Sequence, residues 1–269
     1  MPARLHHERI ARSDTRPERW LLLTHGIFGS GANWRGIARK VNERRPAWGV
    51  VIVDLRLHGR SDDGTPPHTI DAMADDIAAL ATELTGVEAL AGHSLGGKVM
   101  AAARDRLDVR QTWMLDSSPS PRPGALTDPH NSILRVLGDL ERLPPTFGKR
   151  DEMVAALVGR GHDVALAQWL AMSAVPYGDA LKLRFDLAAL REILADYYAR
   201  DLWPNVDDPA KGGVELVIAD RSSVFTDDDK ARIAREPAHV RAHHVNAGHW
   251  LHIEAPSPVV ELLSQHLPP

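Results

Sequence analysis

The stretch "LAGHSLGGK" holds the serine whose surroundings best suit nucleophilic chemistry. Ser94 stands between Gly92 and Gly96, after an apolar run and before a helix-like segment. Each glycine costs roughly 0.5–1 kcal/mol in regular structure, so the pattern indicates a backbone shape or a close approach that only glycine allows. A sharp strand-to-helix turn has both features, and it exposes the serine beside a helix N-terminus that favours developing negative charge. We therefore predict that Ser94 is a nucleophile.

A histidine late in the chain can supply the base that such a serine needs. A serine hydroxyl is a poor nucleophile until a base takes its proton, and imidazole has a suitable pKa. His249 stands in "NAGHWLHIEAP", in a loop beyond the last expected strand, and we predict that it is this base. The nearby His252, His243 and His244 are expected to be surface or supporting residues, because no carboxylate spacing typical of a metal site accompanies them.

A loop near the N-terminus can stabilise negative charge on a substrate oxygen. The text "HGIFGS", residues 25–30, directly follows an apolar strand-like run. Backbone N–H groups in such a loop can bind an oxyanion, and we expect that of Ile27 first and that of Phe28 second. The N–H of Leu95, next to the nucleophile, would be the other donor. His25 is predicted to brace this loop rather than to transfer protons.

The composition excludes several kinds of site and partner. The chain has 269 residues and no cysteine, which rules out disulfides, thiolate metal sites and a cysteine nucleophile. Its net charge of −4, with neither sign in a long run, disfavours nucleic-acid binding. No signal-peptide core and no apolar stretch of about 18 residues is present. We expect a cytoplasmic protein with a small-molecule substrate, no membrane partner, and no metal or organic cofactor; the oligomeric state is not indicated.

The elements that position these residues alternate between buried strands and helices. Strands are expected at Trp20–Thr24, Val50–Leu55, Val87–Ala91, Thr112–Leu115, Val214–Ala219 and Val240–Val245. Helices are expected at about Asn33–Glu43, Ile70–Leu84, Leu95–Arg106 and Ser257–His266. Strands that are apolar on both faces and alternate with helices predict an α/β fold with a parallel sheet covered on both sides.

One segment interrupts this alternation. After the proline-rich "SSPSPRP", the text between about residues 128 and 198 shows several helical stripes and no convincing strand. We therefore predict one core domain, residues 1–119 and 206–269, with a helical cap inserted at 120–205 over Ser94. A cap over an acyl site needs an apolar underside. The candidates for that substrate wall are Phe147, Trp169, Met172, Tyr177, Phe185 and Trp203.

Four motifs in register resemble those of the α/β-hydrolases over nearly the whole chain. They are "HGIFGS", "DLRLHGRS", "GHSLGGK" and "AGHWLHIEAP". The lysine of the third, the tryptophan of the fourth and the text "LRFDL" are similar to a branch of small carboxylesterases and thioesterases. The resemblance implies an eight-stranded, mostly parallel sheet with its second strand antiparallel, and a cap after strand six. It also implies that residues 5–10 form an edge strand.

The acid that orients His249 is left open between two aspartates. In most of the family it follows the seventh strand, and here that position falls at Ser222, which carries no charge, with Asp220 two residues early. Some hydrolases that resemble this chain take the acid from the end of strand six, where Asp116 follows "TWML". We favour Asp116 and keep Asp220 as the alternative.

The function implied is hydrolysis of small to medium carboxylic esters or thioesters through an acyl-enzyme intermediate. Hydrolysis of C–C bonds, or perhydrolysis of the haloperoxidase type, resembles the same constellation and stays an alternative. Epoxide hydrolases and haloalkane dehalogenases carry aspartate at the elbow, so Ser94 disfavours them. A non-catalytic binding protein is the least favoured interpretation. Proteins that use this fold only for binding have usually lost a catalytic residue, whereas Ser94 and His249 are both present here.

Overall fold

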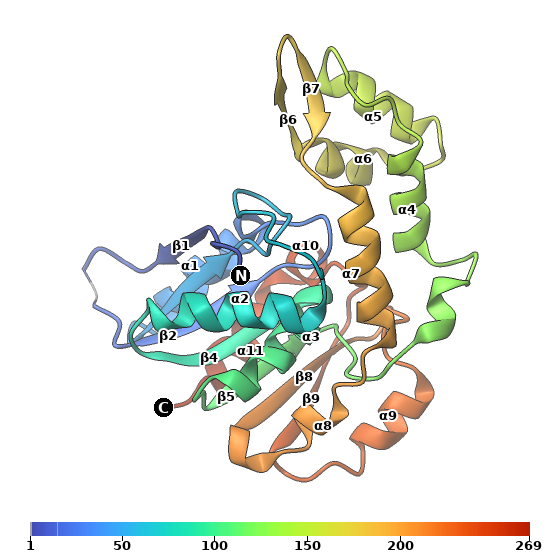
Figure 1. Cartoon of the computed structure of the whole chain (residues 1–269). Helices are drawn as coiled ribbons and strands as arrows, with labels where there is room; N and C mark the ends of the chain where they lie inside the picture. Colours follow the sequence, from blue (N-terminus) through green and yellow to red (C-terminus); the bar gives the residue numbers. More distant parts are fainter. Residues whose placement is uncertain (1, 15) are drawn as a thin grey trace.

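Seven strands form the central sheet of the computed structural model, which describes residues 2–14 and 16–269 (Figure 1). In sheet order they are β1 (His7–Ile10), β3 (Trp48–Val53), β2 (Arg19–Thr24), β4 (Val87–His93), β5 (Gln111–Leu115), β8 (Gly213–Ala219) and β9 (Val240–Val245). β1 pairs antiparallel with β3, and the other neighbouring strands pair parallel. The carboxyl ends of β4, β5, β8 and β9 therefore meet along one edge.

Helices cover both faces of this sheet because its central strands are apolar on both sides. Every residue of β3 and β5 is buried. Leu22 joins one buried cluster with α2 (Ile70–Thr82) and α3 (Leu95–Ala103). Its neighbours Leu21 and Leu23 point to the opposite cluster, which includes α1 (Arg35–Arg44) and α11 (Pro256–His266). This alternation is the period of two expected for strands.

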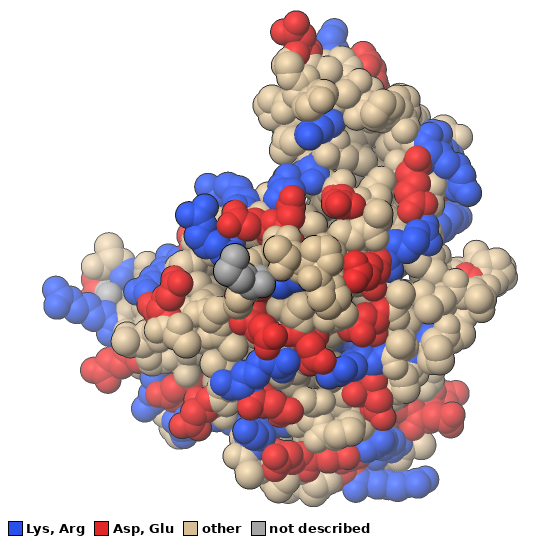
Figure 2. Space-filling model, in the orientation of Figure 1, with Lys and Arg blue, Asp and Glu red and all other residues tan. Residues whose placement is uncertain are grey.

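Short elements complete the core. They are η1 (Gly31–Trp34), η2 (Arg104–Arg106), α8 (Trp203–Val206), η4 (Pro209–Lys211), α9 (Asp227–Ile233) and α10 (Leu251–Glu254). Figure 2 shows Lys and Arg mixed with Asp and Glu over the face drawn, and neither sign gathers into one large patch. In the part of the chain that is described, no helix combines the length and the apolar character needed to cross a membrane.

The segment between β5 and β8 forms an arm at one end of the sheet (Figure 1). It consists of η3 (Pro123–Leu126), α4 (Ser132–Glu141), α5 (Arg150–Val158), α6 (Val164–Ala171), the hairpin of β6 (Ala174–Tyr177) and β7 (Ala180–Leu183), and α7 (Leu187–Ala199). The hairpin, α5 and α6 lie farthest from the sheet, and α7 runs back towards it. We call residues 120–205 the insertion.

The structure corrects four details of the expected fold. The sheet has seven strands rather than about eight, and the antiparallel strand is the first, not the second, because the chain enters the sheet directly at its antiparallel edge. The insertion therefore follows the fifth strand rather than a sixth. It also contains a hairpin where no strand was expected. Each hairpin strand has only four residues, too few to show an alternating pattern, and the connecting turn contains Gly178 at φ +60°.

Candidate active site

The turn around Ser94 is strained, and its glycines are required by close backbone approaches. Ser94 joins β4 to α3 at φ 52° and ψ −116°, a region that side chains rarely adopt. A Cβ on Gly92 would lie 2.1 Å from the Gly96 oxygen, and one on Gly96 would lie 2.5 Å from the His25 oxygen. A Cβ on Gly97 would lie 2.4 Å from that of Ser117. The glycine pattern thus lets the turn pack against the neighbouring strand ends.

Asp116 and His249 form a buried pair beside this turn. The Nδ1–H of His249 donates to Asp116 Oδ2 at 2.7 Å, and the Asp116 side chain is fully buried. The other carboxylate oxygen of Asp116 accepts the Ala219 N–H at 3.2 Å. With Nδ1 occupied, Nε2 is the nitrogen that His249 presents to a reacting group. His249 and Ser94 line the same pocket, so the three side chains meet at one end of the sheet.

Asp220, the alternative acid, has a different partner. Its carboxylate accepts from His244 Nδ1 at 2.8 Å, and both side chains are largely exposed. Ser222 lines the pocket, and its hydroxyl accepts the Val224 N–H at 3.3 Å. The structure therefore brings Asp116, and not Asp220, to the imidazole of His249.

The loop after β2 is held by two neutral histidines. His25 Nε2 accepts the Leu55 N–H at 3.0 Å, and its Nδ1–H donates to the Gly26 carbonyl at 2.7 Å. Burial lowers the pKa of His25 to about 4 and that of His58 to about 3, so both rings stay uncharged at neutral pH. The Phe28 N–H donates to His58 Nε2 at 3.2 Å. That bond removes Phe28 from the expected oxyanion donors and leaves Ile27.

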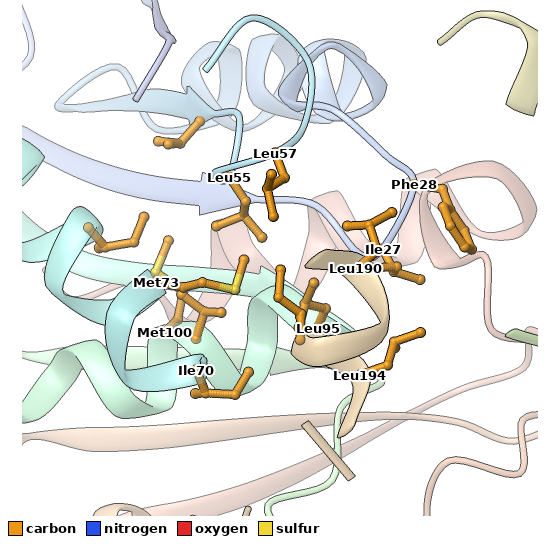
Figure 3. Packing of buried hydrophobic residues seen from close by; sticks show 14 of the residues in the cluster. Ile27, Phe28, Leu55, Leu57, Ile70, Met73, Leu95, Met100, Leu190 and Leu194 are labelled. Carbon is orange, nitrogen blue, oxygen red and sulfur yellow. The ribbon is translucent and has the colours of Figure 1, made fainter. Parts of the chain in front are cut away.

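Ile27 and Leu95 retain backbone donors next to Ser94. Within residues 2–14 and 16–269, neither backbone N–H has an acceptor. Figure 3 shows the side chains of Leu190 and Leu194, from α7, packed beside those of Ile27 and Leu95. The insertion thus shields the side-chain faces of the two segments that carry these donors.

His93 fixes the loop that carries the base, a role that the sequence reading missed. Its Nε2–H donates to the His249 carbonyl at 2.7 Å, and the two rings lie 4.7 Å apart. Burial and the neighbouring His249 hold the pKa of His93 well below its usual range. The available signal was its place directly before Ser94, at the end of β4, where a side chain faces the loop after β9.

Two residues join the insertion to the nucleophile, and they were also missed as site residues. Tyr197 lines the same pocket as Ser94, and burial raises the pKa of the Tyr197 phenol so that it stays protonated. Lys98, on α3, donates from Nζ to the carbonyls of Ser120, Tyr197 and Arg200 at 2.9, 2.9 and 2.8 Å. Both ends of the insertion are therefore tied to α3, the helix that directly follows Ser94.

A pocket of about 310 Å³ opens beside Ser94 and His249. Its walls come from the start of the insertion, the end of α7, the loop after β8 and the loop after β9. The lining residues other than these two are Lys98, Ser118, Ser120, Arg122, Ala125, Asp128, His130, Asn131, Ser132, Ile133, Tyr197, Tyr198, Arg221, Ser222, Ser223, Val224 and Trp250. This wall is mostly polar.

None of the expected wall residues lines this pocket. Trp203 is buried, and its Nε1–H donates to Ser120 Oγ at 2.7 Å. Phe185 packs edge-on against Phe28, and Phe147 is buried and paired through its backbone with Leu181. These three aromatic side chains hold the insertion to the core or to itself.

The other three expected wall residues lie farther out. Trp169 packs against Trp250 with ring centroids 5.0 Å apart, and with Met172 it lines a neighbouring pocket that Phe28 also borders. Met172 is 70% exposed. Tyr177 is 57% exposed at the hairpin, where Lys182 lies over its ring. The sequence overestimated the apolar wall, because it does not show which large side chains of the insertion pack against the core and which, like Met172 and Tyr177, are exposed.

The extra histidines form no cluster of possible metal ligands. Among the described residues, no group of three or more His, Asp or Glu side chains is placed to hold an ion. His243 instead binds the buried Glu215 at 2.6 Å, and His252 lies in the ring cluster with Trp34 and His93.

Comparison with known proteins agrees with this geometry. The sequence pattern of the Alpha/beta hydrolase family matches residues 21–262. The chain belongs to this family. Among solved structures, a marine microorganism esterase superimposes with a TM-score of 0.84 at 23% identity, over 98% of this chain and all of the other. The described residues of this α/β-hydrolase form a sheet of seven strands, one fewer than the resemblance implied.

Curated relatives of this α/β-hydrolase include esterases and lipases. Esterase YbfF of Escherichia coli is 27% identical over 258 residues, which are 92% of each chain. The sn-1-specific diacylglycerol lipase ABHD11 of Mus musculus is 26% identical over 254 residues, covering 92% of this chain and 80% of the relative. These similarities extend through the insertion as well as the core.

Proposed function

We propose that this α/β-hydrolase cleaves small to medium carboxylic esters or thioesters, with residues 120–205 serving as a cap. One observation carries the proposal: a buried carboxylate, Asp116, lies 2.7 Å from His249 in a pocket shared with Ser94 on its strained turn. A nucleophile, a base and an acid on three strand ends form the arrangement that serine hydrolases use. The esterase and lipase names of the curated relatives support the same reaction class.

The reaction follows from these positions in two halves. Ser94 Oγ attacks the carbonyl carbon while His249 Nε2 takes its proton, and Asp116 stabilises the imidazolium. The oxyanion accepts hydrogen bonds from the Ile27 and Leu95 N–H groups. His249 returns the proton to the leaving alcohol or thiol, which departs and leaves an acyl-serine. Water then attacks this acyl group with His249 as base, releasing the acid and restoring Ser94.

Ser94→Ala tests this mechanism directly. We expect the wild type to react with a fluorophosphonate probe and to hydrolyse p-nitrophenyl or coenzyme A esters of graded chain length. The variant should bind no probe and lose about 10⁴- to 10⁶-fold in kcat, because the acyl-enzyme no longer forms. Its thermal unfolding should match the wild type, since alanine fits the same turn. A variant that kept more than about 1% of the wild-type rate would exclude Ser94 as nucleophile.

A further inference from the structure

The pocket beside Ser94 is built for a polar substrate group rather than a fatty chain. Its fully apolar side chains are Ala125, Ile133 and Val224, with the indole of Trp250 beside them. The remaining wall is largely hydroxyl, amide and charged groups, including five serines besides Ser94: Ser118, Ser120, Ser132, Ser222 and Ser223. A site for a long acyl chain would be lined mainly by apolar side chains.

Three cations line this pocket, and two of them already have partners. Lys98 donates to three backbone carbonyls. Arg221 forms an ion pair with Glu254 at 3.1 Å and also donates to Asn246. Neither Lys98 nor Arg122 has a carboxylate within 4.0 Å among the described residues, but the three N–H groups of Lys98 are all taken by carbonyls. Arg122 is therefore the cation of the lining that has neither an ion pair nor a full set of acceptors.

Arg122 is also held in place. Its Nη1 donates to the carbonyls of Ser223 and Val224 at 2.9 and 3.2 Å, and its backbone N–H donates to the Tyr198 carbonyl at 2.6 Å. No acceptor in the described chain takes Nε or Nη2. A guanidinium fixed in this way has the planar pair of donors that binds a carboxylate in a bidentate manner.

Arg122 lines the same pocket as Ser94 and Tyr197. Burial raises the pKa of the Tyr197 phenol, and the Arg122 charge opposes that rise. The acidic side chain of the lining, Asp128, is exposed, and its Oδ1 accepts the His130 N–H at 2.8 Å. Asp128 therefore does not neutralise the guanidinium through a direct ion pair.

We propose that Arg122 binds a carboxylate carried by the substrate, so that the enzyme prefers esters or thioesters with an anionic group near the scissile bond. This inference rests on the proposed ester hydrolase function. It assigns Arg122 to substrate selection and gives it no part in bond cleavage.

Matched pairs of charged and neutral esters test the proposal. One pair is mono-4-nitrophenyl glutarate and 4-nitrophenyl pentanoate, with the charge on the acyl side. The other is 4-acetoxybenzoate and its methyl ester, with the charge on the alcohol side. We expect kcat/KM, after subtraction of the enzyme-free rate, to favour the anionic ester in at least one pair. Raising NaCl from 0.05 to 0.5 M should weaken that preference.

Arg122→Gln should lower kcat/KM for the preferred anionic ester about 10- to 100-fold and change its neutral partner less than about 3-fold. Arg122→Lys should keep part of the preference that Arg122→Gln loses, because lysine retains the positive charge but lacks the planar pair of N–H donors. The control is Arg142→Gln, an exposed residue of the insertion, which should leave both esters unaffected. Equal losses on both esters, or a wild type that prefers neutral esters in both pairs, would overturn the proposal. Failure of the wild type on every ester, p-nitrophenyl acetate included, would instead reject the ester hydrolase function.

Discussion

Asp116 has two features that fit a triad acid better than a simple strand-end residue. Its φ is 43°, a conformation that aspartate tolerates better than most residues, and its side chain is fully buried. A buried carboxylate needs hydrogen bonds, and those to His249 and the Ala219 N–H supply them. The same bonds hold the imidazole so that Nε2 is the nitrogen that accepts a proton.

We predict that Asp116→Asn lowers kcat about 10⁴-fold, because an amide favours the wrong imidazole tautomer and cannot stabilise the imidazolium. Asp220→Asn is the control and should change kcat less than about 3-fold, since Asp220 binds the exposed His244. Steady-state kinetics on one chromogenic ester checks both variants. The opposite ranking would transfer the acid role to Asp220.

The sequence predicted Ser94 and His249 as site residues because each lies in a motif whose chemistry is local, and the structure places both in one pocket lining. It favoured Asp116 and kept Asp220 as the alternative, because the choice depends on which strand end faces His249 across the sheet. Phe28 was misjudged for a similar reason: its N–H is taken by His58, which lies 30 residues away. Arg122 lies in no motif, and only the structure places it in the pocket lining without a carboxylate within 4.0 Å among the described residues.

At the scale of elements, Lys98 connects α3 to both ends of the insertion. Its ammonium group is buried, and burial lowers its pKa to about 8. A buried charge destabilises the folded protein unless it is hydrogen-bonded. The three carbonyls that it binds belong to Ser120, at the start of the insertion, and to Tyr197 and Arg200, near its end. The Lys98 side chain thus links the segment where the chain leaves the core to the segment where it returns.

We predict that Lys98→Met destabilises the protein by about 2–4 kcal/mol, because methionine fills the space but leaves three carbonyls with fewer donors. Relative to the wild type, the rate of amide hydrogen exchange should increase more at residues 118–122 and 197–201 than in β3, which lies away from this contact. Lys149→Met, at an exposed site on the insertion, is the control and should change neither quantity. Unchanged exchange in Lys98→Met would show that packing of α7, rather than this lysine, holds the insertion.

Elements were predictable to the extent that their apolar pattern was clear. Strands were predicted from short, mostly apolar runs such as "WLLLT" and "TWML", and the helix at Ile70–Leu84 from its apolar stripe. The hairpin β6–β7 was missed, since "AVPY" and "ALKL" are not such runs and only Ala174 among their residues is buried. The size of the sheet came from the family resemblance, and the structure reduces it by one strand.

Across the whole molecule, one buried cluster continues from the sheet into the insertion. It joins Leu95 and Val99 of α3 to Leu190 and Leu194 of α7, and on to Leu140 of α4. Folding therefore buries apolar surface of the core and of the insertion against each other, and we expect the two to unfold together. Three buried histidines support the site: His25 in the loop after β2, His58, which accepts the Phe28 N–H, and His93 at the end of β4.

These histidines predict an acid-sensitive stability. Burial lowers the pKa of His25 to about 4, that of His58 to about 3 and that of His93 well below its usual range. In the unfolded chain each ring titrates near pH 6.5. Below that pH the unfolded state binds more protons than the folded state, so the free energy of unfolding falls as pH falls, by up to about 1.4 kcal/mol per pH unit for each ring.

The stabilising effect is thus complete above pH 6.5 and is lost progressively towards pH 4, where carboxyl groups begin to contribute as well. Urea unfolding at pH 7.5, 6.0 and 5.0 should show a decrease in the free energy of unfolding on the order of 4–6 kcal/mol over this range.

His58→Asn should be less stable at pH 7.5, but its free energy of unfolding should fall less on acidification, because one group with a lowered pKa is gone. His130→Asn, which removes an exposed ring, should keep the wild-type slope. A free energy of unfolding that stayed constant from pH 7.5 to 5.0 would mean that these rings are protonated in the folded protein, contrary to the neutral ring that must accept the Phe28 N–H.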